Sequence, residues 1–391
     1  MSHVSSLRRR PPSAVQPVSQ RPAVAAPPSS RSTGPVDTFT PSASPAPAPR
    51  SGYSEPVAAK DLPDPGTGTG ILTLNLANGQ ERGGYRTPEG RERQAKLIRE
   101  TGATLVAFQE VDTNVDRSGN ANTSLDVVRR FNPAFDRFTS GEPVPTVPIG
   151  ADAPDTALRK GSDGTTLYQT PQGTLVTGES FSGDDRGGLG DSGADATYGN
   201  AFYVGAPHKV VEAYTLALPP TPGGDGPPVA TAEELAALGD GKLTDAERDA
   251  LGQRNEALRK GSPLEPRSAL VTRVVGPDGR ERSVITTHLS KNGDKELRAR
   301  QLAYLAQVAQ AESKGPPARE VVVLGDFNSS TKEVGAALEG AGLNRVVGGK
   351  KETGANYDQI WVSGGTATDT NAQVEAGRAS DHKYAGYTVL R

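Results

Sequence analysis

Residues that can handle phosphate and divalent cations follow an apolar run near the end of this chain. The run, 321–324, holds three valines and a leucine, and Gly325, Asp326 and Asn328 come after it. Such a run predicts a strand buried on both faces. Side chains two residues apart in an extended chain point the same way. Asp326 and Asn328 are therefore expected to converge on one target, and the alternative is a polar turn that only ends a strand.

Similar polar side chains stand at the ends of the other predicted strands, which span 71–76, 104–108, 283–287, 359–362 and 387–390. Only four histidines occur in the chain and two of them belong to this set, while cysteine is absent. Packing alone would not select carboxylates, imidazoles and amides at so many strand ends. The set favours a site for a hard metal ion and a phosphate. Its members beyond Asp326 and Asn328 are Asn75, Glu110, His288, Asp358, Asp381 and His382.

These residues lie in seven stretches that resemble, in order, the motifs of the endonuclease/exonuclease/phosphatase superfamily. That superfamily has the fold of DNase I, apurinic endonucleases, sphingomyelinases and inositol polyphosphate phosphatases. The resemblance covers about 70 to 391 and implies an α/β (α+β) fold, a four-layer α/β/β/α sandwich of two packed mixed sheets. The stretches are 74–76, 108–112, 198–201, 287–289, 325–328, 357–360 and 380–382.

The resemblance implies a set of metal ligands. Glu110 matches the principal metal ligand of the family, Asn75 is expected beside it, and Asp381 is expected near the metal. Oxygen ligands of this kind suit Mg²⁺ or Mn²⁺. One of these two ions is therefore the expected cofactor.

The resemblance also implies catalytic roles for five residues. Asp358 and His382 match a carboxylate–histidine pair, in which the carboxylate fixes the imidazole tautomer and supports its charged form. His382 would act either as a general base on water or as a phosphate-stabilising cation. Asp326 would orient or deprotonate the attacking water, and Asn328 would donate to a phosphate oxygen. His288 matches an imidazole used as a general acid or a phosphate contact.

One further match lies on the substrate side. Asn200, within the stretch 198–201, matches a substrate-side amide of the family. The residues that follow it, 203–205, lack the serine-arginine pair that commonly stands there. One positive charge that faces the phosphate is therefore expected to be missing.

The chain is predicted to consist of a disordered tail, 1–65, and a catalytic domain, 66–391. The tail is basic and rich in proline, serine and alanine, a composition that cannot bury enough surface to fold. No apolar segment follows Arg8–Arg10, so no Sec-type signal peptide is predicted. No run approaches the roughly 18–20 apolar residues of a membrane span. We expect a monomer, either cytoplasmic or exported by a non-classical route.

Two insertions, about 139–197 and 219–262, are expected to be mainly irregular. The first contains a predicted hairpin, 165–169 and 174–177, and the second contains two predicted helices, 232–238 and 245–259. Their glycine-rich, acidic character does not favour a long polyanion gripped through many phosphates. They are expected to determine the substrate.

The sequence therefore predicts a metal-dependent phosphoesterase that cleaves phosphodiester or phosphomonoester bonds by in-line attack of water. A nuclease or related phosphodiesterase is the first hypothesis, acting on nucleic acid, a phospholipid headgroup or a small phosphodiester. A sphingomyelinase-like or inositol-phosphatase-like hydrolase is the alternative within this class. The alternative from another class is an inactive scaffold of the same fold. A net charge of −3 excludes a broadly cationic nucleic-acid coat.

Overall fold

The apolar run 321–324 forms a strand buried on both faces in the computed structural model, as predicted. All four side chains are at most 1% exposed. Val321 and Val323 pack into a core under the helices, whereas Val322 and Leu324 pack into a core between two sheets. This alternation is the period of two that a strand imposes. The strand, β12 (Glu320–Asp326), is central in its sheet and leads into Asp326.

The structure describes residues 56–77, 87–183, 195–223, 226–291, 294–348 and 357–391. These residues belong to the unit Ala46–Arg391. The predicted tail lies outside the described residues as far as residue 55. The short strand β1 (Pro56–Val57) pairs with residues 373–374, and Ala59 is buried, so ordered structure begins before residue 66. The predicted boundary of the tail is corrected accordingly.

A ten-stranded mixed sheet forms one half of the core. Besides β1, its strands are β2 (Thr69–Asn75), β3 (Leu105–Thr113), β4 (Thr146–Pro148), β5 (Ala157–Lys160), β6 (Thr165–Thr170), β7 (Gly173–Ser182), β8 (Thr197–Gly205), β15 (Thr368–Glu375) and β16 (Tyr384–Leu390). Their order is β1-β15-β16-β2-β3-β8-β7-β6-β5-β4. β2 is parallel to β3 and antiparallel to β16.

A six-stranded mixed sheet forms the other half. Besides β12, it contains β9 (Lys209–Ala217), β10 (Ser268–Val275), β11 (Glu281–His288), β13 (Leu343–Val347) and β14 (Asp358–Ser363). The order is β13-β14-β12-β11-β10-β9. β11 and β12 are parallel, while β14 is antiparallel to β12.

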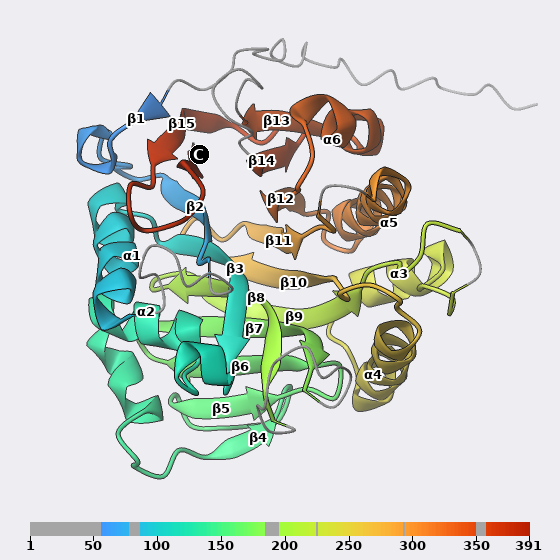
Figure 1. The fold of residues 1–391 in the computed structure, drawn as a ribbon, viewed down its shortest axis with the longest axis horizontal. Helices are drawn as coiled ribbons and strands as arrows, with labels where there is room; N and C mark the ends of the chain where they lie inside the picture. The colour runs from blue at the N-terminus through green and yellow to red at the C-terminus, as the bar shows by residue number, and fades with distance from the viewer. Residues whose placement is uncertain (1–55, 78–86, 184–194, 224–225, 292–293, 349–356) are drawn as a thin grey trace, which may run out of the picture. The chain divides into compact units, whose positions relative to one another are not determined.

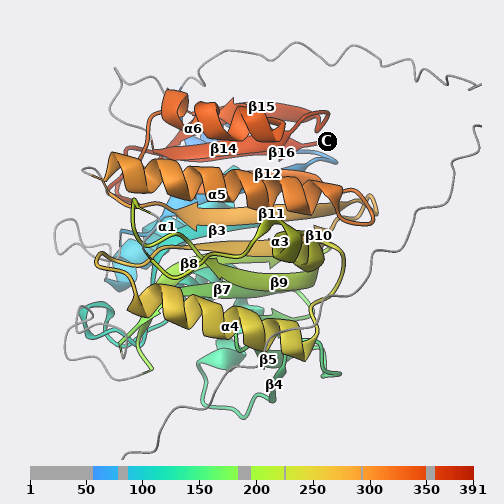
Figure 2. The same cartoon turned by 90° about the vertical axis from the view of Figure 1, so that its right-hand side faces the viewer.

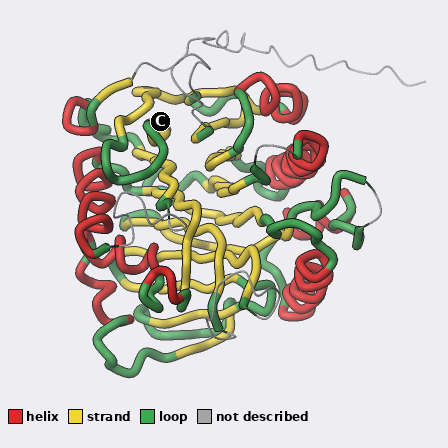
Figure 3. The backbone as a smooth tube through the Cα atoms, in the orientation of Figure 1, coloured by secondary structure: helices red, strands yellow, loops and turns green. Residues whose placement is uncertain are grey.

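Helices cover the outer faces of both sheets, as Figures 1 and 3 show. Side chains of α1 and α2 pack with the ten-stranded sheet, and those of α3, α5 and α6 pack with the six-stranded sheet. Figure 2 shows α5 lying along β11 and β12. The predicted four-layer α/β/β/α sandwich is confirmed. The helices are α1 (Pro88–Thr101), α2 (Thr123–Phe131), α3 (Ala232–Gly239), α4 (Asp245–Lys260), α5 (Lys295–Lys314) and α6 (Thr331–Leu338).

The first insertion is more regular than predicted. The predicted hairpin is confirmed as β6 and β7, and β4 and β5 continue the sheet beyond it. β5 and β6 mix buried and half-exposed positions, and β6 contains three threonines, so their apolar signal is weak. The second insertion holds the two predicted helices, α3 and α4. Each begins with a complete capping box, Thr231 with Glu234 and Thr244 with Glu247.

Candidate active site

Strand direction brings the candidate residues to one edge of the sandwich. The parallel strands β11 and β12 both end there, and the antiparallel strand β14 begins there. The register pairs His288 with Asp326 and Asp326 with Asp358. In the other sheet Asn75 closes β2 and pairs with Gln109 of β3. The last residues of β11 and β12 and the first residue of β14 therefore lie at the same edge, because β14 runs opposite to β12.

Asp326 lies at the centre of this edge and is 1% exposed. Its Oδ2 accepts a hydrogen bond from the Asn75 amide at 3.2 Å. The same oxygen lies 3.2 Å from Nε2 of His288 and 3.6 Å from Nε2 of His382. One carboxylate oxygen thus gathers side chains from three distant segments of the chain.

His382 and Asp358 form the close pair that the sequence predicted. Nδ1 of His382 lies 2.6 Å from Oδ2 of Asp358. Burial of the imidazole opposes its charge, but the charge and hydrogen bond of Asp358, with the charge of Asp326, raise the pKa of His382 to about 11. Oδ1 of Asp358 is buried and has no hydrogen-bond partner among the described residues. His382 is therefore held as an imidazolium at neutral pH.

Glu110 enters the site through a backbone irregularity. The pairing of β3 with β8 shifts register between Phe108 and Val111, and Glu110 has a φ of 57°. Such a bulge re-aims a side chain. Oε1 of Glu110 accepts a hydrogen bond from the Asn75 amide at 3.3 Å. Burial, followed by the charges of Asp381 and Asp326, raises the pKa of Glu110.

The donor set fits a divalent cation that keeps part of its water shell. Within the described ranges no three histidine or carboxylate side chains lie close enough to form a metal cage by themselves. Mg²⁺ commonly takes one or two carboxylates and retains several waters. Glu110 and Asp381 would hold such an ion with Asn75 beside them, because Nδ2 of Asn75 faces Glu110 and its Oδ1 accepts from the backbone N–H of Ala77 at 2.9 Å. The unbalanced negative charge that raises the pKa of Glu110 is the charge that a cation would neutralise.

Asp326 and Asn328 do not share one face of an extended chain, so the expected geometry is wrong, while their convergence on one target stays a prediction. Asn328 has a φ of 46°, in the left-handed region. Its backbone N–H donates to Oδ1 of Asp326 at 2.9 Å, and its side-chain amide donates to the carbonyl of Leu289 at 3.0 Å. The chain turns sharply after β12, because the Asp326 carboxylate holds the backbone two residues further on.

Gly325 allows the two strands to meet directly before Asp326. Its φ is 141°, and a Cβ at this position would lie 2.0 Å from the carbonyl oxygen of Thr287 on β11. Since that neighbour is backbone, no side-chain movement would relieve the clash. Glycine here places Asp326 against His288.

Asn200, on β8, is buried beside the start of β10. Its amide donates to the carbonyl of Ser268 at 3.1 Å, at the start of β10. Its Oδ1 has no hydrogen-bond partner among the described residues, and the side chain is 1% exposed. Asn200 also lines a cavity of about 490 Å³ together with Val111 and Glu179. No hydrogen bond described in the structure joins it to the other candidate residues.

Two residues that were not predicted as site residues contact His288. Nη1 of Arg267 lies 3.0 Å from Nδ1 of His288, and the hydroxyl of Tyr198 lies 3.4 Å from the same atom. Arg267 immediately precedes β10, the strand that pairs with β11. Its position directly before a strand was the sequence feature that could have indicated a role in the site. Arg267 brings to the site a positive charge of the kind expected to be missing after Asn200.

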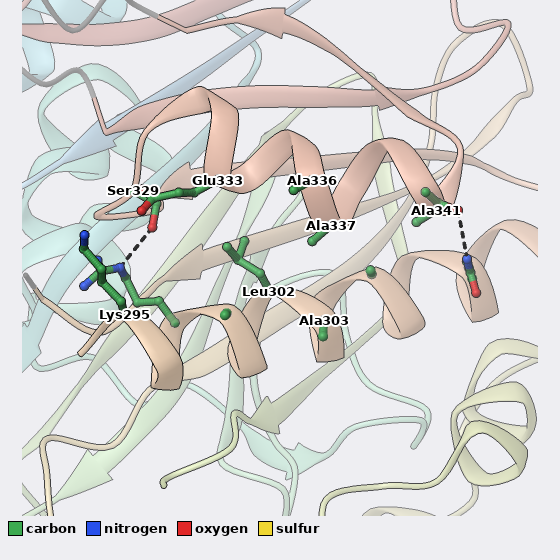
Figure 4. Close-up of a pocket in the computed structure, with 13 residues that line it drawn as sticks. Lys295, Leu302, Ala303, Ser329, Glu333, Ala336, Ala337 and Ala341 are labelled. Atoms are coloured by element: carbon green, nitrogen blue, oxygen red, sulfur yellow. Dashed lines mark hydrogen bonds between the residues drawn. The ribbon is translucent and has the colours of Figure 1, made fainter. Parts of the chain in front are cut away.

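A separate cavity of about 680 Å³ lies between α5 and α6 (Figure 4). Two of its lining residues are joined by a hydrogen bond, which Nε of Arg298 donates to the hydroxyl of Ser329 at 3.0 Å. No candidate site residue is among the described residues that line it. Its walls are mainly the small or apolar side chains Ala299, Leu302, Ala303, Ala306, Ala336 and Ala337.

The fold and this edge together define a class of protein. The sequence model of the endonuclease/exonuclease/phosphatase family matches residues 72–382. The chain belongs to this family. No match is found among curated proteins. None of the helices in the described part of the chain is long and apolar enough to cross a membrane.

Solved structures similar to this chain come from diverse sources. A Beutenbergia cavernae endonuclease/exonuclease/phosphatase is 14% identical, with a TM-score of 0.49, over 83% of this chain and 72% of that one. A mannosyl-6-phosphatase of Bacteroides thetaiotaomicron is 11% identical, with a TM-score of 0.48, over 83% and 99%. The human Nocturnin catalytic domain is 15% identical, with a TM-score of 0.46, over 83% and 94%. These identities are too low for an activity to be transferred.

Proposed function

We propose that the protein is a divalent-metal-dependent phosphoesterase that hydrolyses P–O bonds by in-line attack of water. The observation that carries this proposal is the convergence on Asp326 of an imidazolium and two further donors. His382 is held in its charged form by Asp358, while Asn75 and His288 contact the same carboxylate oxygen. The same Asn75 nitrogen also donates to Glu110. Such an arrangement suits a phosphoryl group with water on one side.

Asp326 is the residue proposed to handle the attacking water. Its buried carboxylate accepts hydrogen bonds and can orient a water molecule or take its proton. Its Oδ1 is engaged by the backbone of Asn328, so Oδ2 is the oxygen that faces the other catalytic groups. The same water must lie in line with the bond that breaks. Asp326 therefore positions the nucleophile.

His382 is proposed to stabilise negative charge on the phosphoryl group. With a pKa of about 11 it carries its proton at neutral pH and is a poor base. Of the two roles that the sequence left open, the phosphate-stabilising cation is therefore favoured. Charge stabilisation aimed at the transition state is commonly the largest part of catalysis.

Asn328 is proposed to donate to a phosphate oxygen. A carboxamide has two N–H bonds, and one of them is used by the carbonyl of Leu289. The second is the one offered to substrate. Asn200, whose Oδ1 has no partner among the described residues, is proposed to contact the substrate on the other side.

The proposed cofactor is Mg²⁺ or Mn²⁺, held by Glu110 and Asp381, with Asn75 beside Glu110 as a hydrogen-bond donor. When bound, it supplies positive charge that stabilises the charge developing on the phosphoryl oxygens and the leaving oxygen. The protein's own contribution is to fix the ligands. The Asn75 amide does so by bonding both Glu110 and Asp326.

A nuclease or related phosphodiesterase is the proposed activity. The test is hydrolysis of DNA, RNA, sphingomyelin, inositol phosphates and a generic phosphodiester by the full chain, with Mg²⁺ or Mn²⁺. A nuclease that grips many phosphates would lose activity steeply as salt rises, whereas a small substrate would show a weak dependence. Absence of turnover on every substrate, or turnover unaffected by EDTA, would overturn the proposal.

A further inference from the structure

His288 is buried, and the groups on the two sides of its imidazole ring allow one arrangement of hydrogen bonds. The side chain is 2% exposed. On one side Nη1 of Arg267 lies 3.0 Å from Nδ1, and on the other Nε2 lies 3.2 Å from Oδ2 of Asp326. A donor-only group and an acceptor-only group thus flank the same imidazole.

The partners fix where the ring proton resides. An arginine guanidinium has five N–H donors and no acceptor, so Nδ1 of His288 must accept. The Tyr198 hydroxyl, 3.4 Å from the same nitrogen, can then only donate to it. The proton must lie on Nε2, beside the Asp326 carboxylate. Which ring nitrogen carries the proton is commonly set in this way by the partner of the other one.

The Nε2–H bond is not fully used within the protein. The contact with Asp326 lies off the line of this bond, and no hydrogen-bond partner of Nε2 is found among the described residues. A buried donor without a linear acceptor costs free energy unless a ligand or water supplies one. The bond is therefore available to an oxygen bound beside Asp326.

We infer that Arg267 is a positioning residue of this centre. Its guanidinium fixes His288 as the neutral tautomer with the proton on Nε2. His288 then serves as a neutral hydrogen-bond donor to a phosphoester oxygen and does not act as a general acid. The last step rests on the proposed function, whereas the tautomer and the charge state do not.

The charged surroundings support a neutral ring. Burial lowers the pKa of His288 well below 6.5, and nearby positive charges add to this effect. An imidazolium would also have to place an N–H bond against the Arg267 guanidinium. The only facing carboxylate in the described contacts is Asp326, which is shared with His382. The titratable and charged groups that face His288 are Tyr198, Arg267, Lys291, Asp326 and His382.

The direct test is nuclear magnetic resonance of the full chain labelled with ¹⁵N at histidine. With four histidines in the sequence, the His288→Gln variant identifies the signals of residue 288 by their loss. The expected result at pH 7 is a neutral ring protonated on Nε2, unchanged between about pH 6 and 8. A ring protonated on Nδ1, or an imidazolium at pH 7, would overturn the inference. This result does not depend on knowing the substrate.

Variants of Arg267 test its part in the arrangement. Arg267→Met removes the donor and the charge, and the His288 pKa should rise by about 1 unit or more. Arg267→Lys, which keeps a positive donor, should restore the low pKa. Glu265→Gln removes the ion-pair partner 3.0 Å away on the other side of Arg267 and should leave His288 unchanged. An unchanged His288 pKa in folded Arg267→Met would refute the positioning role.

The outcomes separate this inference from the proposed function. If Arg267→Met does not fold, the inference is judged from the tautomer of His288 in the wild type and from the His288 pKa in Arg267→Lys. The expected tautomer in a chain that hydrolyses no phosphoester would refute the proposed function and leave the role of Arg267 intact. Conversely, an active enzyme with a charged His288 would refute only the inference. If the chain is an active enzyme, the pH profile of kcat/KM for Arg267→Met should show the ionisation of His288, which the wild-type profile lacks.

Discussion

His382 bridges two buried carboxylates through opposite sides of one ring. Nδ1 lies 2.6 Å from Oδ2 of Asp358, and Nε2 lies 3.6 Å from Oδ2 of Asp326. The first contact fixes the tautomer and supports the charge, while the second directs the remaining N–H towards the centre of the site. The two carboxylates therefore have different tasks. Asp358 orients the imidazole, and Asp326 is the carboxylate that we propose faces the substrate.

Asp358→Asn should reduce kcat/KM by about 10²–10⁴ with little change in fold. The amide keeps the size of the side chain but removes the charge that holds His382 as an imidazolium. The measurement is steady-state hydrolysis of the best phosphoester, with circular dichroism to confirm folding. Asp369→Asn is the matched control, because Asp369 is exposed and pairs only with groups away from the site. A folded Asp358→Asn enzyme with wild-type activity would contradict this assignment.

Glu110→Gln should weaken Mg²⁺ binding by tenfold or more, about 1.4 kcal/mol. The amide cannot supply the charge that a hard cation requires. The measurement is thermal unfolding against Mg²⁺ concentration, since an ion at 100 times its Kd stabilises the folded chain by about 2.7 kcal/mol. Glu233→Gln on α3, where the side chain is exposed, should behave like the wild type. Equal Mg²⁺ responses in wild type and Glu110→Gln would exclude Glu110 as a ligand.

His208 should make stability depend on pH in a definite direction. It is 7% exposed, Nε2 lies 2.9 Å from the Thr69 hydroxyl, and burial lowers its pKa below 6.5. Because the folded state favours the neutral ring, the contribution of His208 is present above about pH 6.5 and is lost as pH falls. Urea unfolding of wild type and His208→Gln at several pH values measures this. The wild-type advantage should shrink between pH 7 and 5, and a constant or growing advantage would contradict it.

The strands that carry the site could be predicted where their sequences contain an apolar run. β12 is the clearest example, since each of its faces is buried against a different core. The prediction failed where strands are half-exposed or lie near an edge. β13 (Leu343–Val347) has exposed and half-exposed positions between its buried ends, and the first half of β15 (Thr368–Glu375) is exposed or half-exposed. Both strands also carry polar residues. Such segments are strands because a neighbour pairs with them, and that neighbour is distant in sequence.

The composition of the site could be predicted, but its internal contacts could not. Strand direction explains why Asp358 and His382, which stand near strand starts, reach residues at strand ends. The bulge at Glu110 and the turn at Asn328 depend on φ values of 57° and 46°. The residue pattern does not predict such values. Arg267 was missed because a single arginine before a strand carries no functional signal until its contact with His288 is known.

A buried ion pair fastens the second insertion to the six-stranded sheet. Glu312 on α5 is 0% exposed and accepts two hydrogen bonds from Arg273 on β10, at 2.7 and 2.9 Å. Arg273 also donates to the carbonyls of Leu238 and Gly241, at the end of α3 and just beyond it. The hydroxyl of Tyr214 adds a further bond to Glu312 at 2.5 Å. The carboxylate therefore holds the arginine that ties α3 to the sheet.

Glu312→Ala should destabilise the fold by about 3–5 kcal/mol, because it leaves the Arg273 guanidinium buried without its counter-charge. Denaturant unfolding at pH 7 measures the loss. Glu100→Ala is the matched control: it removes a carboxylate from the exposed i,i+4 pair with Lys96 at 2.9 Å, and should cost about 0.5 kcal/mol or less. A Glu312→Ala chain as stable as Glu100→Ala would show that water reaches Arg273. The attachment of α3 would then rest mainly on the apolar packing of Leu235 and Leu238 and on the hydrogen bond from Arg319 to the Gly239 carbonyl.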